Sequence, residues 1–301
     1  MLSVKPTDGD GDFTFLRNSA ATRVNAQGLV ENVQILSSNL VQNGSFSQIG
    51  AEEVTNGSFS QEGVQLVTNG SFDTDSDWSK SGWSIQNGQA INTASASGNN
   101  LYQGSVTSVG GNFKVVIDTT ISAGSVRVML GGGSGGYNVI GEATTSGTYT
   151  YYGVSNGTDN RLLLQTGSGS TIGSVSIDNV SVKEVGQDWS LGTGWSIGDD
   201  KAICDGGNNN LKQDVSSVSG KNYKVTFDVL DYTSGTLFID IGGSSSQTTT
   251  NLGSKTFYFT STSSNDLRFY GGAFIGSITN ISVKEVGQNW NIEDTWTIGN
   301  S

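Results

Sequence analysis

The sequence predicts an all-β chain in which an N-terminal anchor segment and a short hairpin-repeat stalk precede tandem jelly-roll β-sandwiches. Short runs of β-branched and aromatic residues alternate with clusters of Gly, Asn and Ser, as strands alternate with turns. No stretch shows apolar residues at helical spacing. A segment of about 100 residues also recurs along the chain, which is typical of modules strung one after another.

Residues 1–39 differ from the rest of the chain and contain the stretch "GDGDFTFLRNSAATRVNAQGLVENVQIL". Phe13–Leu16 and Leu29–Leu36 have the composition of short strands around an irregular loop. The segment is too short to form a core of its own. We therefore expect it to pack on another chain or on another copy of itself.

Residues 40–65 carry a second, shorter repeat, seen in "VQNGSFSQIG" and "VTNGSFSQEG", and a third copy, "VTNGSFD", follows at the start of the next segment. It places an asparagine every 13 residues, at Asn43, Asn56 and Asn69. Asn-Gly between β-forming residues predicts a type I′ hairpin turn. Because one such repeat cannot bury a face alone, we expect symmetry-related copies to cover Phe46 and Phe59.

Two modules follow, residues 66–185 and residues 186–286. Both end in "SVKEV", and in both cases "GQ" comes next in the chain. Each has short alternating runs for about eight strands, enough for a jelly roll or Greek-key sandwich. In the last strand of both modules the alternation slips at the same place, after Ile177 and after Ile278, which predicts a β-bulge.

Residues 287–301 repeat the opening of the second module and predict the start of a third, incomplete module. Lys183 matches Lys284, and Trp189 matches Trp290, at an offset of 101 residues. The alternative is that Trp290 and Trp296 cap the second module.

The composition argues against enzymatic and nucleic-acid functions. The chain has no His, so Ser-His and Cys-His nucleophiles and the usual zinc ligands are absent, and no carboxylate pair stands out. The net charge of −12 disfavours phosphate binding. No apolar stretch has the length of a membrane span, and "MLSVKPTDGDGDF" lacks the features of a signal peptide. Cys204 lies in the alternating stretch "KAICDG", which predicts a buried small hydrophobe.

Exposed rings beside polar groups are the candidates for sugar binding. The six Trp recur with the module period, which indicates core positions. If Leu267 and Phe269 point inward, Arg268 and Tyr270 point outward. The same reasoning predicts exposed rings at Tyr152 and Tyr258.

Two acidic clusters, "DGDGD" and "DTDSD", alternate carboxylates as calcium-binding loops do. Neither completes an EF-hand, because the glycine at the sixth position and the glutamate at the twelfth are missing. A solvated acidic turn is the alternative for each.

The motifs "NGSFDTDSDW", "GWSI" and "IDNVSVKEV" resemble jelly-roll carbohydrate-binding modules appended to xylanases and glucanases. The resemblance covers residues 66–185. It implies a structural calcium ion held through Asp73 and Asp178 in the first module. The second module departs from the pattern, because it lacks the "NGSF" opening and has Thr279 where the first has Asp178.

The stretch "GDGDFTFLRNSAATRVNAQGLVE" and the module ends "VSVKEV" resemble bacteriophage virion fibre and tail proteins. The resemblance implies a virion structural protein of the head or tail, assembled in the bacterial cytoplasm. Residues 1–39 would bind another virion protein, the chain would form a homotrimer, and the modules would bind host-surface glycan. No nucleic-acid partner and no membrane insertion are expected. The alternatives are a bacterial surface or secreted polysaccharide-binding protein and an architectural capsid decoration protein without a ligand.

Overall fold

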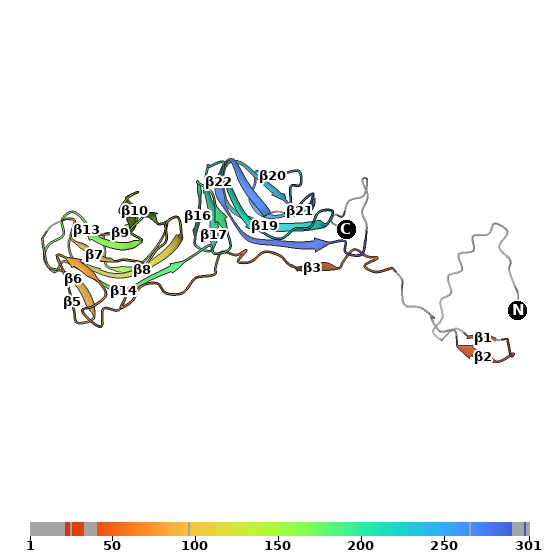
Figure 1. Cartoon of the computed structure of the whole chain (residues 1–301), viewed down its shortest axis with the longest axis horizontal. Helices are drawn as coiled ribbons and strands as arrows, with labels where there is room; N and C mark the ends of the chain where they lie inside the picture. The colour runs from red at the N-terminus through yellow and green to blue at the C-terminus, as the bar shows by residue number, and fades with distance from the viewer. Residues whose placement is uncertain are drawn as a thin grey trace. The chain divides into compact units, whose positions relative to one another are not determined.

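A computed structural model describes residues 22–24, 26–32, 41–95, 97–264, 266–290 and 298 (Figure 1). All the regular secondary structure within these residues is β, which confirms the predicted fold class. None of the described residues forms a helix of the length and hydropathy needed to span a membrane. The chain divides into two units, Met1–Gly44 and Ser45–Ser301.

Among the described residues of the first unit, β1 (Thr22–Val24) and β2 (Val30–Asn32) form an antiparallel ladder. The β2 strand lies within the predicted strand Leu29–Leu36. The predicted strand Phe13–Leu16 lies outside the described residues.

The second unit contains two β-sandwiches, which we call the first sandwich (β4 to β14) and the second sandwich (β15 to β22). The first sandwich has two sheets with the strand orders β10-β9-β13-β7-β4, to which β12 adds along β9, and β11-β8-β14-β6-β5. Its strands are β4 (Ser79–Ser81), β5 (Trp83–Gln86), β6 (Gln89–Asn92), β7 (Asn100–Gln103), β8 (Asn112–Ile121), β9 (Val126–Gly132), β10 (Tyr137–Ala143), β11 (Gly147–Val154), β12 (Asn156–Gly157), β13 (Arg161–Thr166) and β14 (Val175–Glu184).

The core of the first sandwich lies between these sheets and follows the two-residue period of a strand. In β8 the side chains of Phe113, Val115 and Ile117 are buried, whereas those between them are half-buried. Leu162 and Leu164 of β13 enter the same core from the opposite sheet. Burying such side chains contributes roughly 1.5–3 kcal/mol each.

The second sandwich repeats this plan with two much longer strands, β19 (Asn222–Ile241) and β22 (Asp266–Val286). These run through both layers, so that its strands join in one nine-stranded arrangement that also takes in β3 (Ile49–Glu52). The prediction of only short strands was therefore wrong here. The other strands are β15 (Ser190–Leu191), β16 (Trp195–Gly198), β17 (Lys201–Asp205), β18 (Asn210–Asp214), β20 (Gln247–Thr249) and β21 (Gly253–Thr260).

The predicted bulge occurs in the last strand of both sandwiches. The register of β14 against β8 shifts between Asp178 and Ser181, and Asn179 there has a φ of 49°. The register of β22 against β19 shifts at the matching place, where Asn280 has a φ of 54°. Asparagine tolerates this left-handed backbone better than most residues do. The sequence of both repeats therefore places an asparagine at the bulge.

The Asn-Gly-Ser-Phe repeats are turns, but the predicted type I′ geometry was wrong. A type I′ turn needs positive φ at two successive residues. Here the positive φ values fall on Asn56 (49°) and Phe59 (57°) of one repeat and on Asn69 (51°) and Phe72 (52°) of the next. In each turn the phenylalanine N–H donates to the asparagine carbonyl, at 3.1 and 3.2 Å.

Each turn requires its glycine because the backbone of the turn lies against a bulge and leaves no room for a Cβ. The φ angle of the glycine is not the reason, since it is not positive. A Cβ on Gly57 would lie 2.0 Å from the carbonyl oxygen of Ile281, and one on Gly70 would lie 2.1 Å from that of Val180. In return, the Ile281 N–H donates to the Gly57 carbonyl at 2.9 Å, and the Val180 N–H donates to the Gly70 carbonyl at 2.9 Å. The residue that follows the bulged asparagine in each sandwich thus pairs with one turn.

The phenylalanine of each turn completes the core of a different sandwich. Phe59 belongs to the core of the second sandwich and packs against Trp189 with the rings tilted by 44° and their centroids 5.2 Å apart. Phe72 belongs to the core of the first sandwich and packs against Trp78 at the same centroid distance, with the rings tilted by 40°. The expectation that symmetry-related copies cover Phe59 was therefore wrong. The second sandwich does have an "NGSF" opening, which the chain supplies from before the first sandwich.

A buried glutamine in each sandwich fixes the arm, by which we mean residues 45–77. Gln213 accepts from the Thr55 N–H at 2.8 Å and donates to the Thr55 carbonyl at 2.9 Å. Gln103 makes the same pair of bonds with Thr68, at 2.9 and 3.0 Å. These bonds hold the turns in register, because a glutamine amide offers both a donor and an acceptor.

Candidate functional site

A row of three side chains crosses the outer face of the second sandwich. Lys224 of β19 pairs with Tyr258 of β21 on one side and with Lys284 of β22 on the other. The residues before and after Lys224 are buried in the core, so the lysine itself points outward. This places an aromatic ring and two cations on neighbouring strands.

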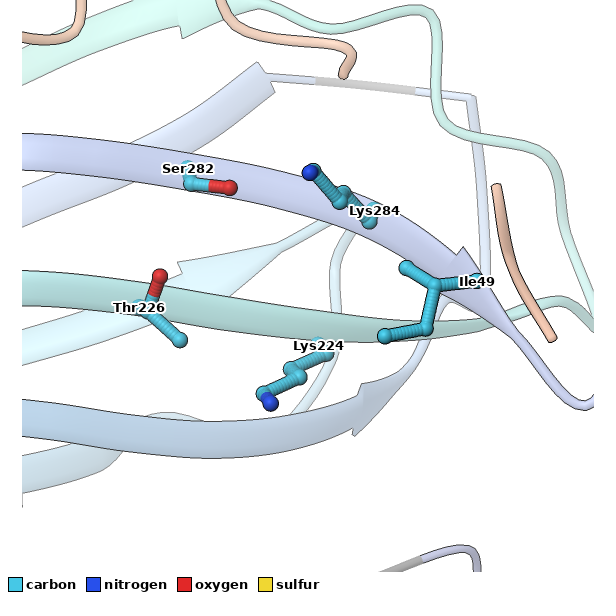
Figure 2. Close-up of a pocket in the computed structure, with 5 residues that line it drawn as sticks. All are labelled: Ile49, Lys224, Thr226, Ser282 and Lys284. Carbon is cyan, nitrogen blue, oxygen red and sulfur yellow. The ribbon is translucent and has the colours of Figure 1, made fainter. Parts of the chain in front are cut away.

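The two lysines flank a shallow hollow, which Ile49, Thr226 and Ser282 also line (Figure 2). Lys224 and Thr226 come from β19, Ser282 and Lys284 from β22, and Ile49 from the arm. The hollow therefore combines two hydroxyl groups, two ammonium groups and one apolar side chain.

The first sandwich contains the same row, formed by Tyr152, Lys114 and Lys183. There the carboxylate of Glu62 lies between the lysines, 2.6 Å from the Lys114 amine and 2.8 Å from the Lys183 amine. The hydrogen bond from Lys114 is the main reason that the pKa of Glu62 is lowered from its ordinary value of 4.5. The same bond raises the pKa of Lys114.

In the second sandwich the arm supplies Ile49 at the place of Glu62. Ile49 pairs with Val286, as Glu62 pairs with Val185. Within the described part of the chain, neither Lys224 nor Lys284 forms an ion pair.

A carboxylate beside this hollow is that of Glu52, which is paired with Lys284 in the ladder. It accepts from the Val283 N–H at 2.7 Å and from the Ser282 hydroxyl at 2.5 Å. The Glu52 carboxylate therefore lies at the edge of the hollow and offsets the charge of one lysine. The charge of the other lysine is left in excess. An anionic group would be favoured at this place.

Tyr152 of the matching row is not a free platform. Its side chain packs against the core of the second sandwich, and a Cβ added to Gly198 would lie 3.4 Å from its ring. Lys114 lies over its ring at 6.0 Å. Tyr152 therefore joins the two sandwiches, whereas the half-buried Tyr258 belongs to the row beside the hollow.

Arg268 and Tyr270 lie on a separate outer face of the second sandwich. Leu267 and Phe269 are fully buried, which confirms the predicted alternation. Tyr270 stacks on Phe238, with centroids 5.0 Å apart and rings within 9° of parallel.

Polar groups surround this stacked pair. The Tyr270 hydroxyl lies 2.5 Å from that of Ser246. The Arg268 guanidinium donates to the buried carboxylate of Asp240 at 2.8 Å, and this bond raises the pKa of Arg268. Arg268 and Asp240 are also direct cross-strand partners. We call Phe238, Asp240, Ser246, Arg268 and Tyr270 the stacked-ring face.

The four predicted glycan-binding residues thus lie in three places. Arg268 and Tyr270 share one face, Tyr258 lies beside the lysine pair, and Tyr152 lies between the sandwiches. Sequence reasoning missed Phe238 and Asp240, because their cross-strand pairing with β22 is not visible in one strand alone. It also missed the lysine pair, although "NFKV" and "NYKV" place the first lysine, and "SVKEV" the second, at matching positions of the two modules.

The two predicted calcium ligands, Asp73 and Asp178, each accept a hydrogen bond from a neighbouring residue. The Asp73 carboxylate accepts from the Ser71 hydroxyl, and the Asp178 carboxylate accepts from the Asn179 N–H, both at 2.7 Å. Asp178 lies opposite Asp118 in the ladder. Three or more acidic, His or Cys side chains do not come together anywhere among the described residues, whereas calcium takes six to eight oxygens. A calcium ion held through Asp73 and Asp178 would need further oxygen ligands, and the site stays a prediction.

Cys204 is buried, as predicted, and its thiol lies 3.7 Å from the Gly207 carbonyl. Burial raises the pKa of this thiol. A buried neutral thiol is a poor nucleophile.

No protein-family model matches this sequence. No curated protein is similar to it in sequence. The solved structures that resemble it include the tandem CBM22 modules of Xyn10C from Paenibacillus barcinonensis, with 12% identity and a TM-score of 0.32, covering 75% of this chain and 99% of that chain. They also include the tandem CBM51 modules of a family 98 glycoside hydrolase from Streptococcus pneumoniae, with 8% identity and a TM-score of 0.23, covering 80% of this chain and 96% of that chain. At these identities and scores, neither structure identifies a ligand for this chain.

Proposed function

We propose that this chain is a non-enzymatic attachment protein whose second sandwich binds a glycan on its stacked-ring face. The observation that carries the proposal is the parallel stack of Tyr270 on Phe238 beside the Arg268–Asp240 ion pair. These side chains project from the outer face of β19 and β22, so they are not needed to fill the core.

The chemistry of this face suits a sugar. The ring faces offer apolar area to the C–H groups of a pyranose, and Arg268, Tyr270 and Ser246 offer hydrogen bonds to its hydroxyl groups. The buried Asp240 fixes the guanidinium, which reduces the entropy lost on binding. A single contact of this kind is weak, and several chains on one particle would multiply it.

The lysine pair adds a second place for a charged substituent on the same sandwich. In the first sandwich the equivalent pair holds the Glu62 carboxylate, so the chemistry of that place suits a carboxylate. We propose that an acidic glycan would also use Lys224 and Lys284.

We further propose a location in a bacteriophage virion, as a fibre of the head or tail that is assembled in the bacterial cytoplasm. Residues 1–39 would attach to another virion protein, and the fibre would be a homotrimer with the sandwiches directed outward. The sequence resemblance supports this placement. A structural calcium ion near Asp73 and Asp178 stays a prediction of the same resemblance, and it would need further oxygen ligands.

The main alternative is a bacterial surface or secreted polysaccharide-binding protein. The stacked-ring face would serve it equally, so the two differ in location rather than in binding chemistry. A capsid decoration protein without a ligand is the second alternative, and it predicts no glycan binding at any valency.

The test is glycan-array binding by the 301-residue chain displayed at high valency. We expect binding that is lost in Tyr270→Ala. The matched control is Tyr137→Ala, which removes an exposed tyrosine of the first sandwich and should bind as the unaltered chain does. Unchanged binding by Tyr270→Ala would reject this face, and no binding by the unaltered chain would reject the glycan function.

A further inference from the structure

The second unit contains three copies of one aromatic pair, each joining an "NGSF" phenylalanine to a tryptophan. The ring centroids lie 5.2 Å apart with an angle of 40° for Phe72 and Trp78, and 5.2 Å apart with an angle of 44° for Phe59 and Trp189. For Phe46 and Trp290 the distance is 5.0 Å and the angle is 38°. The third pair therefore already has the geometry of the other two.

The backbone around the third tryptophan is also the same. The Trp290 N–H donates to the Gly287 carbonyl at 3.1 Å, as the Trp189 N–H donates to the Gly186 carbonyl at 3.2 Å. The residue before Trp290, Asn289, has a φ of 73°, and the matching Asp188 has a φ of 71°. The turn that presents the indole is thus complete.

Exposure separates the third pair from the other two. Phe59 and Phe72 are 2% and 1% exposed, and their tryptophans Trp189 and Trp78 are 7% and 6% exposed. Phe46 is 45% exposed and Trp290 is 41% exposed. In the described part of the chain, two of the pairs are buried in the core of a sandwich, whereas the third is half-exposed. Two large rings held together at the surface form an apolar patch that favours a partner.

We propose that the Phe46–Trp290 pair is the docking site of a third β-sandwich of the same repeat. The sequence of residues 287–301, which repeats the start of the second sandwich, would open it. Each "NGSF" repeat of the arm then serves one sandwich, and the order is reversed: the last repeat serves the first sandwich, the middle repeat the second, and the first repeat the third.

The two filled sites show what the occupant has to supply. It needs a bulged last strand whose N–H donates to the arm, as the Ile281 N–H donates to the Gly57 carbonyl at 2.9 Å. It also needs a glutamine that clamps the arm backbone, as Gln213 clamps Thr55. A flat apolar partner or an unrelated helix has neither the bulged strand nor the glutamine. These two requirements therefore favour a sandwich of the same repeat as the occupant.

The test extends the chain with a third sandwich and measures the accessibility of position 46. One extension joins residues 190–286 after Trp290, and a second joins residues 79–185 there, so that the result does not depend on the folding of one sequence. A Phe46→Cys variant of each is labelled with a thiol reagent and compared with the same variant of the 301-residue chain. We expect labelling to be about ten-fold slower or more in an extended chain, because a buried position reacts only through local opening.

Phe59→Cys is the matched control and should be slow in every chain. The added sandwich should also unfold at a lower temperature when Phe46 is replaced by alanine. Fast labelling of position 46 in both extensions would overturn the proposal. So would a dimer of the 301-residue chain in sedimentation that dissociates in Phe46→Ala, because the occupant would then be a second copy. The result does not depend on glycan binding.

Discussion

Replacing Phe59 with alanine should destabilise the second sandwich, whose own strands begin more than a hundred residues later in the chain. Phe59 is 2% exposed, and its ring packs at an angle against that of Trp189. The indole N–H of Trp189 donates to the Asn56 carbonyl, 133 residues away in sequence, at 3.1 Å. The part of the arm around Phe59 therefore belongs to the second sandwich, although it precedes the first sandwich in the chain.

The size of the effect follows from the buried ring. Truncating a buried phenylalanine to alanine costs about 3–5 kcal/mol, because transfer free energy is lost and a cavity remains. Phe46→Ala removes a half-exposed ring and should stay within about 0.5 kcal/mol, which is usual for surface positions. Phe59→Ala should therefore lower the free energy of unfolding several times more than Phe46→Ala does, although both residues occupy the same position of the repeat.

Hydrogen-exchange mass spectrometry in increasing denaturant is the assay, because a chain with two sandwiches need not unfold in one step. We expect faster exchange in β19 and β22 of Phe59→Ala and unchanged exchange in β8 and β14. Phe72→Ala should give the reverse pattern. Equal loss of protection in both sandwiches, or none in either, would refute the assignment of one repeat to each sandwich.

Three further predictions concern the arm. Gly57→Ala should destabilise the second sandwich by about 2 kcal/mol or more in denaturant unfolding, since its Cβ would lie 2.0 Å from the Ile281 oxygen, whereas Gly104→Ala has open space around it and should be neutral. Glu62→Gln should cost only about 0–1 kcal/mol, because the ion pairs are partly exposed. The pKa of Glu62 is lowered in the folded state, so its contribution is present above the ordinary carboxylate pKa and is lost as pH falls through the lowered value. Stability curves of the two chains should therefore converge in acid, and a constant gap would contradict this. Calcium, if bound near Asp73, should raise the unfolding temperature of the first sandwich, an increase that EDTA reverses and that Asp73→Asn abolishes. No shift with calcium would reject that site.

Much of each sandwich could be predicted because its signals are local. The alternation in "NYKVTFDV" predicts which side chains of β19 are buried, and the structure buries Tyr223, Val225 and Phe227. The slip after Ile177 predicts the bulge for the same reason. A strand pattern carries its own two-residue period, so no knowledge of its neighbours is needed.

The role of the arm could not be predicted, because it depends on contacts far apart in sequence. Asn-Gly is the strongest short-range hairpin signal, and it suggested a local turn between two strands. In the structure Gly57 is instead selected by its approach to the carbonyl oxygen of Ile281. The signal that could have found it was the match in number between the three "NGSF" repeats and the three repeat-opening tryptophans Trp78, Trp189 and Trp290, which pair in reverse order.

The candidate site was predicted only in part, for a related reason. Outward-facing residues can be read from alternation, which identified Arg268 and Tyr270. Their partners Phe238 and Asp240 come from a neighbouring strand, and strand register is not written in either strand alone. The tie between Tyr152 and the second sandwich likewise depends on how the two sandwiches meet.

The most direct test of the proposed function is hydrogen exchange of the 301-residue chain with and without the glycan that binds most strongly on the array. We expect added protection in the peptides that carry Phe238, Ser246 and Tyr270, with the first sandwich unchanged. Protection that appears only in the first sandwich, or only in the arm, would contradict it.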